Sequence, residues 1–394
     1  RSQCLRFHSR LPQDLEPLHG VKVAGSTFNW RFRPSSVVIP SCFERPKGGA
    51  CPLAGSLQLR EVERMAEAAS SKPAGDGPEG AMEGDHRDNI FQFFRSHTAY
   101  DMLPESGKVL LLDGSISAYS ALKVMHANQQ QAVPVWDGRG DRYLGMVTTS
   151  DMLELVLVCS KSDACSSLAD AMRAINLEMW MSAYARPSGC PDVSVEIHPD
   201  DDLIRVLRTL VHNDCRVLPV LDRDGAAPLL NQCIVGQVTY LLLFRFLYFH
   251  QEEDLGTLEG TLGAVGIGTL GEDKLITVQA SEGVERALSL MSQHRVSALP
   301  VLDGQGCFID MYADADVLAL KNLDLDIDVA TALQHARAGQ PNRCITCSID
   351  DPLSKVVAGF SNAKSTRLAC LDSSGRIKGV VTLTDLFKFL AGSS

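Results

Sequence analysis

Three aspartates recur at nearly one distance behind an apolar, strand-like stretch that itself ends in an aspartate. The separations are 14 residues from Asp137 to Asp151, 13 from Asp303 to Asp316 and 13 from Asp372 to Asp385. An ionised carboxylate only accepts hydrogen bonds, so each of these side chains either caps the helix that follows or receives the hydroxyls of a bound molecule. Because the spacing recurs behind strands of the same kind, we interpret them as ligand contacts and keep helix capping as the alternative.

One pair of cysteines, Cys344 and Cys347, has the CxxC spacing among the 12 cysteines of the chain. A zinc site needs a second such pair or a pair of histidines, and neither stands nearby in the sequence. A redox pair opens a helix and has a lowered thiol pKa, whereas the sequence around these two residues alternates like a strand. We therefore expect buried, reduced thiols and no metal. Free cysteines in this number favour a reducing compartment.

The composition excludes several classes of protein. Among 394 residues, 37 are Lys or Arg and 48 are Asp or Glu, which gives a net charge of −11. Nucleic-acid binders carry a basic surface and anionic membranes attract one, so the sequence predicts neither partner. The best apolar run, Leu241 to Phe249, contains Arg245 and falls short of the ~18 residues of a spanning helix, so we expect a buried helix there.

The N-terminal part of the chain differs in character from the rest. Residues 66–89 are rich in Gly, Pro, Ser and Ala, which is typical of a flexible linker. They separate a mostly irregular N-terminal region, 1–65, from an amphipathic body. Arg1, Arg6 and Arg10 stand without an acid in the first thirteen residues, which is typical of a transit peptide and also of many loops. We expect a cytoplasmic or nuclear protein, with a transit peptide as the alternative.

The body contains an internal repeat, which we place at residues 90–160, 180–250, 265–322 and 340–394. Each copy has a short strand, a helix, an apolar strand, a turn, a second strand and a last helix. The first helices repeat apolar residues at i, i+3, i+4 and i+7, starting at Ala118, Leu203, Val284 and Leu353. A unit of this βαββα plan is too small to close a core, so we expect a mixed α/β (α+β) fold in which the copies pack in pairs.

Two local features refine this plan. Acidic residues or Ser precede the first helices, as in Asp200 to Asp202, and are predicted to cap them and to favour their dipoles. In the second copy a longer turn, 226–232, moves the position of the repeated aspartate to Leu242. The second copy therefore lacks its aspartate.

These repeats resemble cystathionine-β-synthase (CBS) domains, and four of them in one chain resemble the γ subunit of the AMP-activated, or sucrose-non-fermenting-type, protein kinase. The motifs that carry the likeness are Gln293 to Val301, Asn322 to Asp324 with Thr331 to His335, and Ile377 to Asp385. The stretch from Phe94 to Leu112 is similar to the plant and algal βγ form, in which a glycogen-binding-like domain precedes the repeats. Val21 to Trp30 faintly resembles the opening strand of that domain, as a remnant or a chance match.

The resemblance implies four CBS repeats packed as two tandem pairs in a disc-like body, with adenine nucleotides in the clefts between repeats. In such clefts β-branched residues sandwich the purine, a carboxylate accepts the ribose hydroxyls, and basic groups with a helix N-terminus hold the phosphate. The ribose carboxylates are then expected to be Asp151, Asp316 and Asp385. The expected hydroxyl contacts are Thr148, Ser150, Ser297, Thr382 and Thr384, and the expected phosphate donors are His294, Arg295, Arg367 and Arg216.

Several basic residues of the family are missing. Where the animal γ subunits carry Arg in the first repeat, Arg and Lys in the second and His in the fourth, this chain has Gln131, Val217, Leu241 and Thr366. In the family, the basic residues of the first two repeats line the pocket whose carboxylate comes from the third repeat. We therefore expect the pocket at Asp316 to be the most weakened.

The resemblance implies a non-catalytic regulatory subunit that binds AMP, ADP or ATP and regulates a Ser/Thr protein kinase in a heterotrimer with a kinase α subunit and a β subunit. Two alternatives stay open, a scaffold of the same fold that has lost its response to nucleotide and a CBS module for another adenosyl ligand such as S-adenosylmethionine. An enzyme is disfavoured, because the chain has no Gly-rich phosphate loop with Lys, no His-Glu-x-x-His helix and no serine nucleophile elbow.

Overall fold

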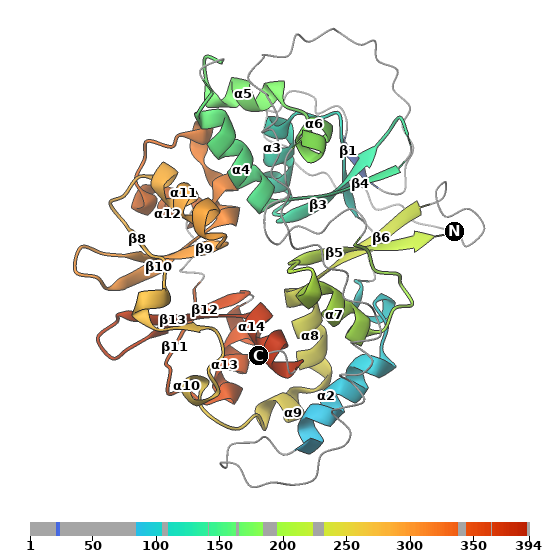
Figure 1. Cartoon of the computed structure of the whole chain (residues 1–394), viewed down its shortest axis with the longest axis vertical. Helices are drawn as coiled ribbons and strands as arrows, with labels where there is room; N and C mark the ends of the chain where they lie inside the picture. The colour runs from blue at the N-terminus through green and yellow to red at the C-terminus, as the bar shows by residue number, and fades with distance from the viewer. Residues whose placement is uncertain are drawn as a thin grey trace, which may run out of the picture. The chain divides into compact units, whose positions relative to one another are not determined.

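The computed structural model describes residues 21–23, 84–104, 109–140, 142–162, 165–183, 195–223, 232–337, 344–363 and 365–391, all of which belong to one compact unit of the chain. The predicted repeats are present in these residues as mixed α/β units (Figure 1). Most of the region 1–65, and residues 66–83 of the predicted linker, lie outside the described residues. The end of that linker was predicted wrongly, because helix α2 (Gly84–Ser96) makes residues 84–89 helical.

The first two repeats follow the predicted order of elements. The first consists of β2 (Leu110–Asp113), α3 (Ala118–Ala127), β3 (Ala132–Asp137), β4 (Arg142–Thr148) and α4 (Thr149–Ser160), with α5 (Leu168–Ala174) and α6 (Leu177–Ala183) after it. The second consists of α7 (Leu203–His212), β5 (Val217–Arg223), β6 (Gln232–Thr239) and α8 (Tyr240–His250), and α9 (Glu252–Gly256) follows it. The short helix η1 (Tyr100–Met102) precedes the first repeat in the chain. Its predicted first strand is reduced to one parallel bridge between Ile197 and Val220.

The last two repeats use the same plan with one change. The third consists of β8 (Val278–Gln279), α11 (Val284–His294), β9 (Ala298–Leu302), β10 (Phe308–Ala313), η3 (Asp314–Ala319) and η4 (Lys321–Leu323), and α10 (Leu262–Val265), β7 (Thr269–Leu270) and η2 (Glu272–Lys274) precede it. Helix α12 (Val329–Arg337) leads to the fourth, which consists of β11 (Thr346–Cys347), α13 (Leu353–Ala363), β12 (Arg367–Leu371), β13 (Ile377–Thr382) and α14 (Leu383–Leu390). The change is that the third repeat ends in two 3-10 helices. Asn322 and Leu323 have φ values of 54°, a left-handed conformation that interrupts a regular helix.

One hairpin register is common to all four repeats. The first residue of the hairpin pairs with the last in each, Ala132 with Thr148, Val217 with Thr239, Ala298 with Ala313 and Arg367 with Thr382. The last helix of each repeat begins directly after its hairpin. The register therefore places the start of one strand beside the N-terminus of a helix, which brings side chains at strand starts close to the repeated aspartates.

The helices and the sheets join the repeats in different combinations. Every apolar helix position predicted from the i, i+3, i+4, i+7 spacing is buried. The helices of the first repeat share one core with those of the third, and the helices of the second share another with those of the fourth, as the green–orange and yellow–red neighbours in Figure 1 show. The sheets join the first repeat to the second through a smaller apolar cluster, and β7 pairs with β13 of the fourth repeat. The sheets thus link tandem repeats, and the helices link one pair to the other.

Two further elements bear on the sequence predictions. Strand β1 (Val21–Val23) lies in the stretch that faintly resembles the opening strand of a glycogen-binding-like domain, and it pairs antiparallel with β2 of the first repeat. The apolar run at 241–249 forms helix α8, in which Leu243, Phe244 and Leu247 are buried, but Phe249 is 82% exposed, so the predicted buried helix is buried on one face only. Across the ranges that the structure describes, no helix has both the length and the apolar character needed to cross a membrane.

Candidate functional site

All four repeats line one cavity of about 2370 Å³. Its wall is built from strand starts and from the N-termini of the last helices, which the shared hairpin register brings together. The predicted site residues that line it are Thr148, Ser150, Arg216, Arg295, Ser297, Asp316, Arg367, Thr382 and Thr384. Asp151, His294 and Asp385 are absent from the lining. The ligand roles of all twelve stay predictions.

The cavity has an excess of basic side chains although the chain as a whole is acidic. Among the described residues of the lining, seven are Lys or Arg and five are Asp or Glu, namely Arg216, Arg245, Lys274, Arg295, Lys321, Arg337 and Arg367 against Glu154, Asp214, Asp310, Asp314 and Asp316. Clefts with one sign of charge concentrate ligands of the opposite sign. The arrangement therefore suits an anion.

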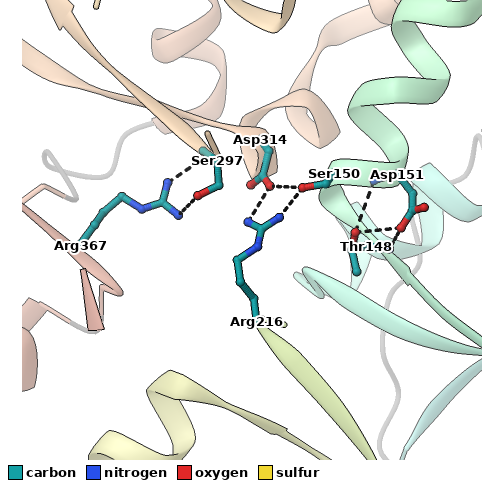
Figure 2. Close-up of polar contacts among 7 residues, drawn as sticks. All are labelled: Thr148, Ser150, Asp151, Arg216, Ser297, Asp314 and Arg367. Atoms are coloured by element: carbon teal, nitrogen blue, oxygen red, sulfur yellow. Dashed lines mark hydrogen bonds and ion pairs between the residues drawn. The ribbon is translucent and has the colours of Figure 1, made fainter. Parts of the chain in front are cut away.

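A polar network from three repeats lies in the wall of the cavity (Figure 2). Arg216 Nη1 donates to Asp314 Oδ2 at 2.8 Å, and Ser150 Oγ donates to the same oxygen at 2.8 Å. Arg216 Nη2 donates to Ser150 Oγ, which closes the triangle. The side chain of Asp314 is 4% exposed and that of Arg216 is 33% exposed, so the carboxylate is inside the wall and the guanidinium reaches the cavity.

A second arginine reaches this network from the fourth repeat. Arg367 Nη1 and Nη2 donate to the backbone oxygen and the hydroxyl of Ser297, both at 3.2 Å. Burial lowers the pKa of Arg367, Asp314 opposes that effect, and the neighbouring Arg216 adds to it. The charges of Asp314 and Asp316 both act on Arg367, so two carboxylates lie within electrostatic reach of this pair of arginines.

Asp314 is ionised in this setting. Burial raises its pKa, but the charges of Arg216 and Arg367, with the hydrogen bonds from Arg216 and Ser150, outweigh burial and hold the pKa below its usual value. Sequence reasoning missed this residue. The available signal was its position directly after strand β10, two residues before Asp316.

The repeated aspartates all occupy the third position of a helix. Oδ2 of Asp151, Asp316 and Asp385 accepts the backbone N–H of the residue three positions earlier, at 2.8, 2.8 and 2.9 Å. In the first and fourth repeats the hydroxyl of Thr148 or Thr382 donates to the same oxygen, at 2.8 and 2.7 Å. Helix capping, the alternative kept open by the sequence, is therefore present in all three repeats and accounts for the constant spacing.

The second carboxylate oxygen distinguishes the three aspartates. Oδ1 of Asp151 accepts from Trp180 Nε1 at 3.1 Å, and Oδ1 of Asp316 accepts from Arg337 Nη1 at 2.9 Å. No residue within the described ranges donates to Oδ1 of Asp385. Asp385 is thus the repeated aspartate whose Oδ1 accepts from none of the described residues.

Arg337 binds two carboxylates at once. In addition to Asp316 it donates from Nε to Asp310 Oδ2 at 2.9 Å and from Nη2 to the backbone oxygen of Met311 at 2.8 Å. Burial raises the pKa of Asp316, and the attraction of Arg337 offsets only part of that rise. The sequence motif ending at His335 was noticed, but Arg337, two residues further along α12, was not.

The positions where basic residues are missing also lie in or near the cavity. Gln131, Leu241 and Thr366 line it without charge, and Val217 is both in the lining and 3% exposed. His294 ends helix α11 as an exposed residue, and Arg295 follows with a φ of 54°. The predicted phosphate donors that line the wall are therefore arginines from the second, third and fourth repeats, Arg216, Arg295 and Arg367.

The CxxC motif ends in a strand. Cys347 lies in β11 opposite Cys370 of β12, with 3.1 Å between the two Sγ atoms, and Cys344 precedes the strand. Burial raises the pKa of Cys344 to about 12, which makes it a poor nucleophile at neutral pH. Among the residues that the structure describes, no group of His, Cys, Asp and Glu is arranged to hold a metal.

A comparison with protein-family models matches the CBS domain at residues 105–158, 267–321 and 342–392. The chain carries CBS domains. The second repeat lies outside these matched ranges, although its hairpin has the register of the others and its last helix also follows directly. The longer turn and the missing aspartate at Leu242 are the departures that set this repeat apart.

Curated relatives extend the resemblance to most of the chain. It is 26% identical over 77% of its length to the 5'-AMP-activated protein kinase subunit gamma of Saccharomyces cerevisiae, and covers 92% of that protein. It is 29% identical to subunit gamma-3 of Bos taurus and 25% identical to subunit gamma of Dictyostelium discoideum, each over 76% of the chain. The chain spans 59% and 52% of the length of these two. It therefore resembles the gamma subunits of this kinase in sequence, as expected.

A solved structure shows the same fold. A protein of Methanocaldococcus jannaschii, described as a proposed archaeal homologue of γ-AMPK, matches 74% of this chain and 99% of its own at a TM-score of 0.57. The two are 14% identical. The likeness confirms the arrangement of the repeats.

Proposed function

We propose that this chain is a non-catalytic, γ-type regulatory subunit that binds AMP, ADP or ATP in its four-repeat cavity and couples the nucleotide to a Ser/Thr protein kinase. The observation that carries the proposal is the presence of two arginines on the cavity wall, Arg216 bonded to the buried Asp314 and Arg367 bonded to Ser297. Guanidinium groups form strong charge-assisted hydrogen bonds with phosphate, so these two side chains match a nucleotide phosphate. The similarity to gamma subunits supports the kinase as the partner.

The first experiment measures AMP binding to the full chain by calorimetry, with the variants Arg216→Gln and Arg367→Gln. We expect each substitution to weaken AMP binding about 10- to 100-fold, because losing one charged phosphate contact costs ~1.5–3 kcal/mol. Arg286→Gln is the matched control, because Arg286 is exposed and lies outside the cavity lining. Unchanged affinity in both cavity variants would contradict the proposal.

Competition separates the nucleotide from another adenosyl ligand. S-adenosylmethionine carries a sulfonium in place of the phosphate, so a cavity with excess arginine disfavours it. We expect ATP and ADP to displace AMP, and S-adenosylmethionine to leave it bound. Displacement by S-adenosylmethionine in preference to ATP would favour the other adenosyl ligand.

Kinase regulation is tested in an assembled complex. The proposal predicts that the full chain, co-expressed with kinase α and β subunits of its source organism, purifies as a heterotrimer. AMP should then change kinase activity, and Arg367→Gln should reduce that response.

We also propose a cytoplasmic or nuclear location, which fluorescence imaging of the tagged chain tests.

A nucleotide-unresponsive scaffold is the second candidate, and one observation favours it. Two of the three repeated aspartates already bind side chains of the protein itself, Trp180 and Arg337. A complex that assembles normally but shows no AMP binding at millimolar concentration would support this candidate over the first.

A further inference from the structure

We propose that Arg337 is a built-in occupant of the third repeat, which excludes a ligand ribose from Asp316 and leaves Asp385 as the carboxylate that receives it. This inference rests on the proposed function, because it assigns the carboxylate that receives the sugar of the same ligand. Asp385 does not line the cavity itself but directly follows the lining residue Thr384. It makes Arg337 a specificity-determining residue that lies outside the repeat pattern.

Asp316 and Asp385 differ in the hydrogen bonding of their second carboxylate oxygen. Both occupy the third position of the helix after a hairpin, and both accept a backbone N–H through Oδ2, at 2.8 and 2.9 Å. The helix differs in type, a 3-10 helix after Ala313 and an α-helix after Thr382, whose hydroxyl also donates to Oδ2 of Asp385. The two aspartates differ further at Oδ1, which accepts from Arg337 in the third repeat and from none of the described residues in the fourth.

Arg337 is fixed in the cavity wall by hydrogen bonds to three buried or partly buried groups. Its guanidinium donates to Asp316, Asp310 and the Met311 carbonyl, at distances of 2.8 to 2.9 Å. The side chain of Arg337 is 12% exposed, and those of Asp310 and Asp316 are 4% and 7% exposed. The three groups thus form a nearly closed cluster in the cavity wall.

Binding a ribose hydroxyl costs more free energy at Asp316 than at Asp385. A ribose hydroxyl would replace a charge-assisted bond between buried groups with a bond from a neutral donor, which is weaker. It would also leave Arg337 with one carboxylate fewer inside the wall, where an unpaired charge is costly. At Asp385 the hydroxyl displaces no protein donor among the described residues, so the ribose gains a bond there without that loss.

In the first repeat, too, a side chain from a connecting helix donates to the repeated aspartate. Trp180, in the connecting helix α6, donates to Oδ1 of the fully buried Asp151 at 3.1 Å. Arg337 likewise comes from a connecting helix, α12, which follows the third repeat. In both odd-numbered repeats, then, a side chain from the following connector satisfies the carboxylate.

The test measures AMP affinity and the number of AMP molecules bound per full-length chain by calorimetry. We expect Asp385→Asn to weaken AMP binding at least tenfold and Asp316→Asn to change it less than threefold. Arg337→Gln alone would leave two buried carboxylates without their cation, so the informative variant pairs it with Asp310→Asn. That double variant keeps the net charge of the cluster and frees Oδ1 of Asp316.

The double variant is expected to bind more AMP per chain than the wild type, and adding Asp316→Asn should remove the gain. Circular dichroism checks that each variant is folded, and Arg286→Gln serves as the neutral control. No gain in the folded double variant would overturn the inference. So would an affinity loss in Asp316→Asn as large as in Asp385→Asn.

The outcomes for the inference and for the proposed function are distinguishable. AMP binding that depends on Arg216 and Arg367 but on Asp316 rather than Asp385 would retain the function and overturn the role of Arg337. If the wild type binds no AMP, the proposed function fails. A double variant that gains binding would then still support the role of Arg337, and one that gains none would overturn it.

Discussion

At the scale of single residues, two neighbouring carboxylates behave oppositely because their numbers of partners differ. Asp314 has two arginines within reach, and their charges lower its pKa in spite of burial. Asp316 shares one arginine with Asp310, and burial raises its pKa. The first carboxylate therefore holds Arg216 on the cavity wall, whereas the second belongs to a cluster of two carboxylates and one arginine.

The substitution Asp314→Asn tests the first of these environments. We expect it to lower the free energy of unfolding by about 3 kcal/mol at pH 7, because it removes one partner of a buried ion pair. A group whose folded pKa lies below the unfolded value of 3.8 stabilises the protein fully above that value, and the contribution is lost as the pH falls through the folded pKa. The difference between wild type and variant should therefore shrink below about pH 4.

Urea unfolding between pH 3 and pH 7 measures this difference. Asp326→Asn is the control, because Asp326 is exposed and its carboxylate has no bond to a described residue. A loss of stability that is the same at pH 3 and pH 7 would show that Asp314 acts through its shape and not through its charge.

At the scale of elements, the cap at the start of the last helix varies between repeats. The hydroxyls of Thr148, Thr239 and Thr382 accept a backbone N–H in the first turn, and each of these helices is an α-helix. The third repeat has Ala313 in this position, and a 3-10 helix follows. The helix type in the third repeat therefore coincides with the loss of the capping hydroxyl.

We predict that Thr382→Ala lowers the free energy of unfolding by about 1 kcal/mol, which is typical for removing an N-cap side chain. Thermal and urea unfolding of the full chain measure the effect. Ser281→Ala, at an exposed position with no described side-chain bond, should stay within about 0.5 kcal/mol of the wild type. Equal effects of the two substitutions would contradict the structural role of the cap.

The elements of the repeats were predictable from the sequence, and the connectors between them were not. Apolar spacing identifies a helix that must bury one face, so the stripes beginning at Ala118 and Leu353 were placed correctly. Asp202 caps α7 as predicted, at 2.7 Å from the Arg205 nitrogen. Trp180 and Arg337 belong to connecting helices outside the repeat, 29 and 21 residues beyond the aspartates they bind, so no spacing rule pointed to them.

At the scale of the whole chain, net charge gave no guide to the candidate site. The acidic total of −11 describes mainly other parts of the sequence, whereas the cavity gathers arginines from three repeats that are far apart along the chain. Sheets join tandem repeats and helix cores join the first with the third and the second with the fourth. A cavity lined by all four repeats depends on both kinds of contact, which a single repeat cannot supply.

The central claim is that this cavity binds one class of ligand, an adenine nucleotide, through Arg216 and Arg367 of its lining and through Asp385, which directly follows the lining residue Thr384. The most direct test is a crystal structure of the full chain grown with AMP. The account predicts the phosphate beside the two arginines, the ribose hydroxyls on Asp385, and Arg337 still bound to Asp316. A cavity without nucleotide at millimolar AMP, or a ribose bound to Asp316 in place of Arg337, would contradict it.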